Sequence, residues 1–232
     1  MNKIIFITLC CYSFSSFASL KLDLYRGDAS VGYQQIAKEV TGSTSITMST
    51  KPNIVTSESF RDPAKVSPWL WIRSSQVPQL LSEKDFDLSE WLKRGGMLVL
   101  LHDGNRSEEA QASTKALDQL KDAVAKSSLA SGEWRVVPTD HSLLRSFYLL
   151  KSLPTCDGLV WSEFRRHDRP FVLSIPYDLV SGVSDSAGSD PCLDKIPRDI
   201  MKRLVVNIAM LAMTTHYKSD QIHLPEILKR LR

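Results

Sequence analysis

The chain has 232 residues, of which 43% are hydrophobic and 24% are charged, and its formal net charge is +3. These values are ordinary for a globular protein and exclude a disordered or fibrous chain, and the length suits a single domain. Because the charge is close to neutral, the composition gives no reason to expect binding to nucleic acid or to anionic lipid.

The first 18 residues have the organisation of a signal peptide. Lys3 precedes an apolar run over residues 4–12, and the small residues Ser16 and Ala18 lie where a signal peptidase would read them. We predict cleavage after Ala18, which leaves a domain over residues 19–232 with a net charge of +2 and a periplasmic or secreted location. The alternatives are a membrane anchor or a first buried strand, but a membrane span needs about 20 apolar residues. No later apolar run reaches that length, so we expect no transmembrane segment after cleavage.

Strand and helix patterns alternate along the mature chain. Residues 43–67 show little periodicity, and we expect one strand there, at residues 45–49. Beyond them, short apolar or aromatic runs predict strands at 68–73, 97–101, 133–138, 159–164 and 169–175. Apolar residues at helical spacing predict helices at 82–94, 107–131 and 197–217, a short helix or turn at 142–150, and a basic helix at 224–232. This alternation favours one layered α/β domain with a mostly parallel central sheet.

Two positions mark the ends of the first of these helices. Ser82 with Asp85 resembles a capping box, which predicts that the helix begins there. Gly95 is suited to the left-handed residue that ends it. A long loop over residues 181–197, rich in Gly, Ser, Asp and Pro, is either functional or held by a disulfide.

Cys156 and Cys192 are the two cysteines that remain after the predicted cleavage. Two thiols in an oxidising compartment commonly pair, so we predict a disulfide between them. The alternative is two buried free thiols. Neither cysteine belongs to a CxxC pair, which argues against a zinc site.

Polar residues follow the carboxyl ends of two of the predicted strands. His102 and Asp103 come after the strand at 97–101, and Tyr177 and Asp178 come after the strand at 169–175. Ligands of open α/β sheets bind outside the carboxyl ends of the strands, so these four residues are candidates for a crevice. The alternative for the first pair is turn formation, because Asp-Gly and Gly-Asn are common turn dipeptides.

Asp140 and His141 form a second Asp-His pair, ahead of the segment 142–150. They are further candidates for the crevice; alternatively Asp140 caps the helix and His141 is held by a neighbouring carboxylate. No HExxH, Walker, GxGxxG or GxSxG motif is present, so the sequence predicts no cofactor and no metal site.

Three segments in this order resemble the bacterial family called domain of unknown function forty-one fifty-nine. They begin SPWLWIR…LKRGGMLVLLHDGN, continue TDHSLLRSFYLLKSLPTCDGL and RPFVLSIPYDLVSGVSD, and end VVNIAMLAMTTHYKSDQIHLPEILKRLR. The resemblance implies a flavodoxin-like three-layer sandwich similar to class I glutamine amidotransferase domains, and no established activity. Those amidotransferases carry a cysteine nucleophile on the turn that here reads His102, Asp103, Gly104, so their chemistry is not expected.

The family's motifs fall on the candidate residues with some departures. Its acidic pair falls on His102 and Asp103, where the first acid is replaced, and its Asp-His-Pro falls on residues 140–142, where Ser142 replaces the proline. Its YDLGCGW segment falls on residues 177–183, with departures at positions 180, 181 and 183. The helix Asn207 and the tail residues His223 and Pro225 match.

The leading interpretation is an exported, non-catalytic α/β domain whose crevice binds a small ligand or a segment of an envelope partner. The basic end formed by Lys229, Arg230 and Arg232 would suit an acidic partner or is a solvated terminal helix. The alternative is a periplasmic hydrolase, metal-assisted or not, that uses Asp103, Asp140, His141 and Asp178. A third interpretation is a structural module of an envelope complex.

Overall fold

The computed structural model describes residues 22–25, 31–61, 66, 69–103, 107–127, 129, 131–156, 159–166, 169–184 and 192–230. The side chains of residues 31, 57, 61, 107–110 and 215–230 are outside that description. The predicted signal peptide, residues 1–18, therefore lies outside the described residues, as do the side chains of the basic end.

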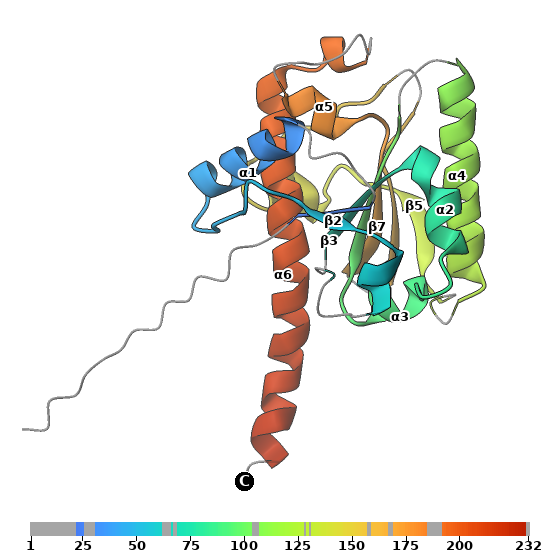
Figure 1. Ribbon diagram of the computed structural model, residues 1–232. Helices are drawn as coiled ribbons and strands as arrows, with labels where there is room; N and C mark the ends of the chain where they lie inside the picture. The colour runs from blue at the N-terminus through green and yellow to red at the C-terminus, as the bar shows by residue number, and fades with distance from the viewer. Residues whose placement is uncertain are drawn as a thin grey trace, which may run out of the picture.

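A seven-stranded sheet forms the centre of the molecule, with the strand order β2-β1-β3-β4-β7-β6-β5 (Figure 1). The first five strands in that order are parallel, and β6 runs antiparallel to both β7 and β5. The sheet confirms an α/β sandwich with a mostly parallel sheet. The strands are β1 (Asp23–Tyr25), β2 (Asn53–Val55), β3 (Trp69–Arg73), β4 (Met97–Leu101), β5 (Glu133–Val136), β6 (Ser162–Arg166) and β7 (Arg169–Ile175).

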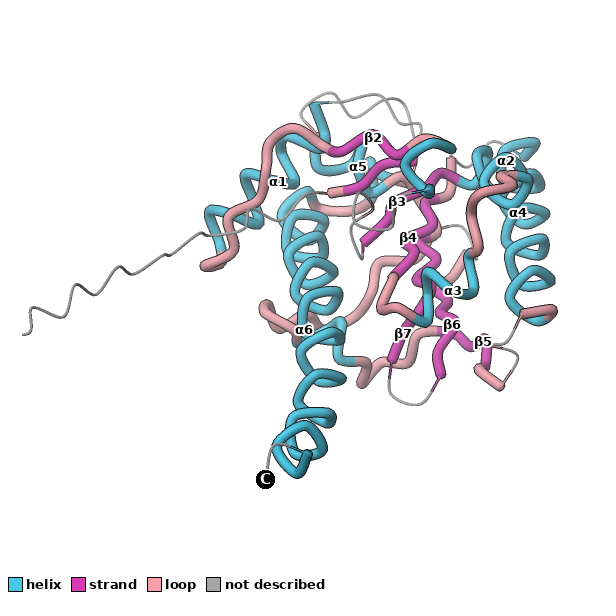
Figure 2. Tube along the Cα trace, turned by 60° about the horizontal axis from the view of Figure 1, so that its bottom comes forward, coloured by secondary structure: helices cyan, strands magenta, loops and turns pink. Residues whose placement is uncertain are grey.

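Helices lie against both faces of this sheet (Figures 1 and 2). On one face α1, α5 and α6 pack against one another, and on the other α2 packs against α4. The α-helices are α1 (Val31–Ser43), α2 (Val77–Ser82), α3 (Leu88–Lys93), α4 (Ser107–Ala125), α5 (Leu179–Val183) and α6 (Arg198–Arg230). Short 3-10 helices are η1 (Ser57–Arg61), η3 (Ser74–Gln76), η4 (Ser142–Arg145) and η5 (Leu193–Lys195). Within the described residues, no helix combines the length and the apolar character that a membrane span requires.

Strand β4 shows why the apolar runs predict the central strands well. Its five residues are all buried, and their side chains alternate between two hydrophobic clusters. Met97, Val99 and Leu101 face the cluster under α1, α5 and α6, whereas Leu98 and Leu100 face the cluster under α2, α3 and α4. A strand that is buried on both faces needs apolar side chains at every position, which is the pattern of residues 97–101.

The start predicted for the helix at residues 82–94 is wrong. Ser82 ends α2, and the next helix, α3, begins only at Leu88. Its cap is Asp87, whose Oδ1 accepts a hydrogen bond from the Glu90 N–H at 2.9 Å. The predicted end is correct, because Gly95 adopts φ 111°, a left-handed conformation that favours glycine.

The strand predicted at residues 45–49 is also wrong. Only Met48 makes a single β-bridge there, and the strand of this region is β2. Threonine side chains take the backbone donors that a strand would use: Thr44 Oγ1 accepts from the Ile46 N–H, and Thr41 Oγ1 accepts from the Met48 N–H. At the other end of the chain, the two predicted helices 197–217 and 224–232 form one continuous helix, α6.

A disulfide joins Cys156 to Cys192, as predicted, across a sequence separation of 36. Both cysteines are buried. The bond ties the segment ahead of β6 to the segment that leads through η5 into α6. It therefore links the connection into β6 to the segment that precedes α6.

Candidate functional site

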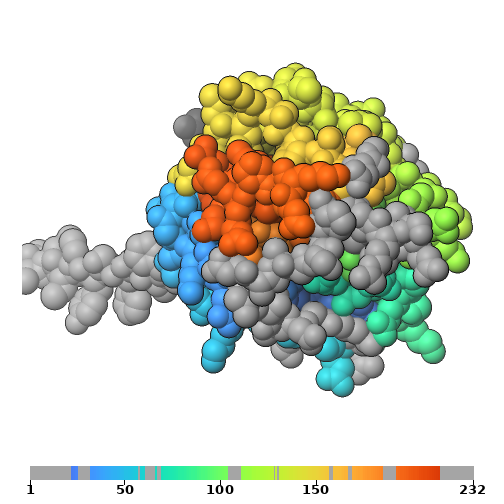
Figure 3. Space-filling model, turned by 90° about the horizontal axis from the view of Figure 1, so that it is seen from above, coloured from blue at the N-terminus to red at the C-terminus, as the bar shows by residue number. Residues whose placement is uncertain are grey.

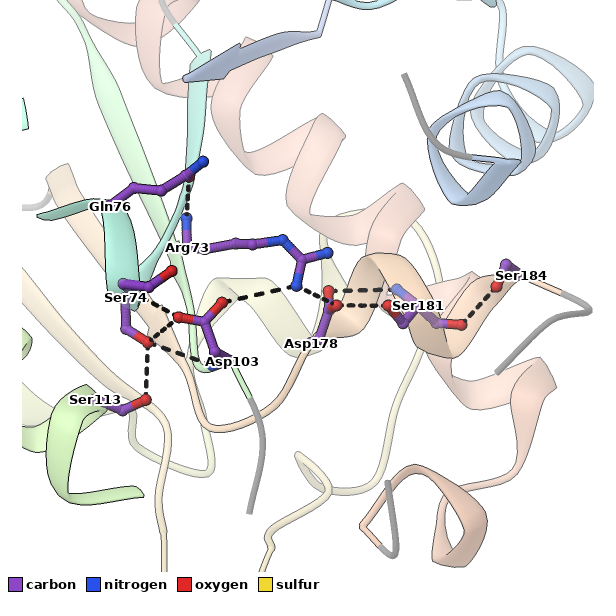
Figure 4. Close-up of polar contacts among 9 residues, drawn as sticks. Arg73, Ser74, Gln76, Asp103, Ser113, Asp178, Ser181 and Ser184 are labelled. Carbon is purple, nitrogen blue, oxygen red and sulfur yellow. Dashed lines mark hydrogen bonds and ion pairs between the residues drawn. The ribbon is translucent and has the colours of Figure 1, made fainter. Parts of the chain in front are cut away.

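Arg73, the last residue of β3, lies between two carboxylates at the carboxyl edge of the sheet (Figure 4). Its NH1 is 2.7 Å from Asp178 Oδ2 and 3.7 Å from Asp103 Oδ1. Burial by itself would lower the pKa of Arg73, but the nearby carboxylates of Asp178 and Asp103 outweigh it and raise that pKa. The guanidinium is therefore a fixed cation. We call Arg73, Ser74, Asp103, Ser113, Asp178 and Ser181 the edge cluster.

Asp103 is held in place by the start of η3. The Ser74 hydroxyl donates to Asp103 Oδ2 at 2.8 Å, and the Ser75 backbone N–H donates to the same oxygen at 2.6 Å. The Ser74 hydroxyl also lies 2.8 Å from the Ser113 hydroxyl of α4. Ser74 and Ser75, which follow β3, thus fix the carboxylate of Asp103, which follows β4.

Asp178 is the N-cap of α5. Its Oδ1 accepts from the Ser181 N–H at 3.3 Å, and its Oδ2 accepts from the Ser181 hydroxyl. The side chain is 8% exposed, compared with 35% for Arg73. The chain after β7 therefore presents one carboxylate that both caps a helix and pairs with Arg73.

Helix α1 borders the edge cluster through Gly32 and Tyr33. A Cβ at Gly32 would lie 2.3 Å from the Val180 carbonyl oxygen, so only glycine allows α1 to approach α5 this closely. Tyr33 is buried, and burial is the main cause that raises its pKa; Asp178 raises it further and Arg73 opposes the rise. The phenol stays protonated beside the ion pair.

His102 is buried behind Asp103 and turns toward β7. Its Nε2 lies 3.2 Å from the Ser174 hydroxyl, and its backbone N–H donates to the Ile175 carbonyl at 3.1 Å. Burial lowers the pKa of His102, and the nearby Asp103 only partly opposes that effect. Among the described residues, its Nδ1 has no hydrogen-bond partner. His102 is therefore a neutral imidazole that is buried at the carboxyl edge of the sheet.

Tyr177 also lies inside the protein. It is fully buried, and its ring packs edge-on against Trp161 with centroids 5.8 Å apart. Burial raises its pKa. The residue is part of the hydrophobic core beneath α5, whereas its neighbour Asp178 reaches the edge cluster.

Asp140 and His141 belong to a different arrangement. His141, not Asp140, caps η4: its Nδ1 accepts from the Leu143 N–H at 3.1 Å. Its Nε2 lies 3.1 Å from Oε2 of the fully buried Glu163, so His141 is held by a carboxylate. Asp140 itself is exposed, and its carbonyl accepts from the Arg145 guanidinium.

Glu163 is the centre of this second arrangement. Its Oε1 lies 2.8 Å from Arg135 Nε and 3.6 Å from Arg165 NH1. Burial would raise the pKa of Glu163, but the hydrogen bonds and charges of His141 and Arg135 outweigh it and lower that pKa. Of the candidate residues, Asp103 and Asp178 belong to the edge cluster, and His141 belongs to a buried carboxylate cluster at β5 and β6. His102, Asp140 and Tyr177 belong to neither.

Arg73 is the residue that sequence reasoning missed. Its partners are 30 and 105 positions away in the chain, so no local spacing links them. A signal was nevertheless present: an otherwise apolar run, WLWI, ends in a charged residue followed by two serines. In a parallel sheet such a residue lies at the carboxyl edge, where ligands bind.

The edge cluster carries two carboxylates, but each already accepts protein donors. Within the described residues, no group of three or more His, Cys, Asp or Glu side chains is arranged to hold a metal ion. What the geometry can supply is a fixed guanidinium with two fixed carboxylates, and the serine hydroxyls bound to them.

The sequence was compared with known families and with curated proteins. No curated protein matches it. The model of the family described as "Domain of unknown function (DUF4159)" matches residues 16–213. That range spans most of the chain and includes every described strand and the first half of α6. The chain belongs to the DUF4159 family.

Proposed function

We propose that the protein is an exported α/β domain that binds a small polar ligand at the edge cluster without catalysing a reaction. The observation that carries the proposal is the partly exposed Arg73 held between Asp103 and Asp178. The five parallel strands follow the order of a doubly wound sheet, 2-1-3-4-5, if β7 is counted as the fifth. In such sheets ligands bind at the carboxyl edge beside the switch between the first and third strands, and Arg73 ends β3.

The charges of the edge cluster indicate what kind of ligand it would accept. One guanidinium and two carboxylates leave a net negative charge, which disfavours an anion. The guanidinium offers planar N–H donors, and the carboxylates offer acceptors in fixed positions. A neutral or cationic ligand with hydroxyl, amide or amino groups suits that set.

The hydroxyls of the edge cluster support binding over catalysis. The Ser74 and Ser181 hydroxyls donate to carboxylates, an arrangement that orients them, whereas a hydrolytic serine needs a base such as histidine. The contact between His102 and Ser174 is the observation that favours the alternative, a hydrolase. Both residues are buried, at 5% and 1% exposure, so a substrate would have to reach a serine inside the sheet.

Export is supported by two features of the chain. The leader over residues 1–18 has the pattern of a signal peptide. The disulfide between Cys156 and Cys192 belongs to an oxidising compartment, such as the periplasm or the exterior. Edman sequencing of the secreted or periplasmic protein should begin at Ser19.

Thermal unfolding of the mature protein with sugars, amino acids and nucleosides tests the binding. A ligand at a hundredfold excess over its Kd should stabilise the fold by about 2.7 kcal/mol. Arg73→Ala should abolish the shift, whereas Arg94→Ala, an exposed arginine ahead of β4, should retain it. A shift that survives Arg73→Ala would place the ligand elsewhere.

Assays of ester and amide hydrolysis distinguish the binding proposal from the alternative, a hydrolase. The binding proposal expects no turnover with p-nitrophenyl esters or amides. Turnover that is lost in Ser174→Ala, with the melting temperature unchanged, would establish the hydrolase instead.

A further inference from the structure

The loop between η4 and the disulfide is fixed by one buried amide on α6. Asn207 Oδ1 accepts from the backbone N–H of Phe147 at 3.2 Å and of Tyr148 at 2.7 Å. Its Nδ2 donates to the carbonyls of Leu143 at 2.8 Å and Tyr148 at 2.9 Å. Because Asn207 is fully buried and uses both ends of its amide, residues 143–148 have one defined conformation.

That conformation directs large apolar side chains into solvent. Leu149 is 83% exposed and Phe147 is 44% exposed, while Leu150 between the loop and the core is buried. The Leu150 N–H donates to the Leu144 carbonyl at 2.8 Å, which closes the loop behind them. A single exposed leucine is common on protein surfaces, so Leu149 alone does not indicate a binding site.

Beside Leu149 the surface is hollowed. A depression of about 490 Å³ lies between this loop and the start of α6, with an apolar floor that includes Leu150, Ile196 and Ile200. In Figure 3 the yellow loop and the orange start of α6 meet on this face. The volume is within the range of about 300–1,000 Å³ that is typical of ligand pockets.

The charged side chains that line the depression are all basic. Lys151, Lys195 and Arg203 line it, and the described residues that line it include no Asp or Glu. Arg203 pairs with Asp199 at 3.0 Å on the helix surface, and an exposed pair of this kind contributes only about 0.3–0.5 kcal/mol. An incoming carboxylate can therefore replace Asp199 at little cost.

We propose that this depression, which we call the Leu149 groove, binds an acidic and apolar peptide segment of a protein partner. Apolar side chains of the segment would pack on Leu149 and the floor, and its carboxylates would meet Lys151, Lys195 and Arg203. An anionic membrane is a less suitable occupant, because membrane surfaces favour a convex apolar face with many cations. The proposal does not depend on the edge cluster.

A short synthetic peptide with two leucines flanked by glutamates tests the groove by fluorescence anisotropy. Two control peptides replace the glutamates with lysines or the leucines with serines. We expect only the first peptide to bind, with affinity that falls as salt is raised. Leu149→Ser and Lys151→Glu should each weaken binding about tenfold, an effect typical of a central interface residue.

Val136→Ser is the matched control, because Val136 is 60% exposed on β5 and does not line the groove. It should bind the peptide as the parent protein does. Equal binding of the lysine peptide, equal loss in Val136→Ser, or no binding by the parent protein would overturn the proposal. So would binding to phosphatidylglycerol vesicles that Leu149→Ser abolishes, in the absence of peptide binding.

Discussion

Asn207 illustrates how much one buried side chain can organise. Four backbone groups of the η4 loop depend on its amide. In Asn207→Ala those groups lose their partners, and each buried unsatisfied group costs about 1–3 kcal/mol. Partial access of water would reduce the sum, so we expect a loss of about 3 kcal/mol in the free energy of unfolding, measured by urea denaturation.

Thr214→Ala is the control for that change on the same helix. Thr214 is exposed, and within the described residues its hydroxyl bonds to carbonyls of its own helix, those of Met210 and Leu211. Its loss should stay within about 0.5 kcal/mol, as for most surface substitutions. Equal effects of the two substitutions would mean that Asn207 does not anchor the loop.

The two ion pairs of Arg73 should differ in strength. Asp178 is closer and less exposed than Asp103, at 2.7 Å and 8% compared with 3.7 Å and 21%. A double-mutant cycle of Arg73→Met with Asp178→Asn should give a coupling energy of about 1 kcal/mol, within the range for side chains in contact. The cycle with Asp103→Asn should give less, since an exposed pair is screened by water. The reverse order would contradict the geometry.

At the scale of elements, the sequence predicts the strands and helices whose burial is set by their own pattern of apolar residues. The apolar runs of β3, β4 and β7 and the helical spacing of α4 are sufficient to place them. The elements of the N-terminal part were harder to predict from the sequence. Strands β1 and β2 have three residues each, too few to show a period, and α1 was not predicted at all. The false strand at 45–49 arose because threonine side chains, which favour strands by composition, here bond to the backbone instead.

The disulfide should contribute measurably to stability, because it closes a long loop between two elements. A bond across a separation of 36 residues restricts the unfolded chain, and typical native disulfides contribute about 2–4 kcal/mol. Thermal unfolding with and without dithiothreitol measures the effect. The Cys156→Ser, Cys192→Ser double variant should unfold at the lower temperature of the reduced protein and should not respond to the reductant. A response in that variant would implicate another thiol.

At the scale of the whole molecule, the sheet decides which candidate residues meet. Asp103 and Asp178 could be expected to approach each other, because β4 and β7 are parallel neighbours and both residues follow carboxyl ends. The separation of His141 from them could not be predicted, since it depends on β5 lying at the far edge beyond the antiparallel β6. The position of Arg73 beside Asp103 could not be predicted either. It depends on β3 being the other neighbour of β4, and local sequence patterns do not contain that pairing.

The acid stability of the fold should show two steps, because two described groups that titrate below pH 7, His102 and Glu163, have lowered pKa values. His102 is neutral when folded, but its unfolded form takes up a proton as the pH falls through about 6.5. Stability is therefore complete above that pH and declines below it, down to the folded pKa. Glu163 is ionised when folded and its unfolded form protonates near 4.5, so a second loss begins below that pH.

Urea denaturation at pH 7.5, 5.5 and 3.5 resolves the two steps. His102→Gln should remove the decline between the first two values and leave the decline between the last two. Glu163→Gln should remove the decline between the last two values and leave the decline between the first two. It should also lower stability at every pH, because it removes the buried carboxylate that pairs with Arg135 and Arg165. If acidification from pH 7.5 to 5.5 leaves the parent protein unchanged, His102 is not a buried neutral imidazole, and the edge of the sheet is more open to water than the structure indicates.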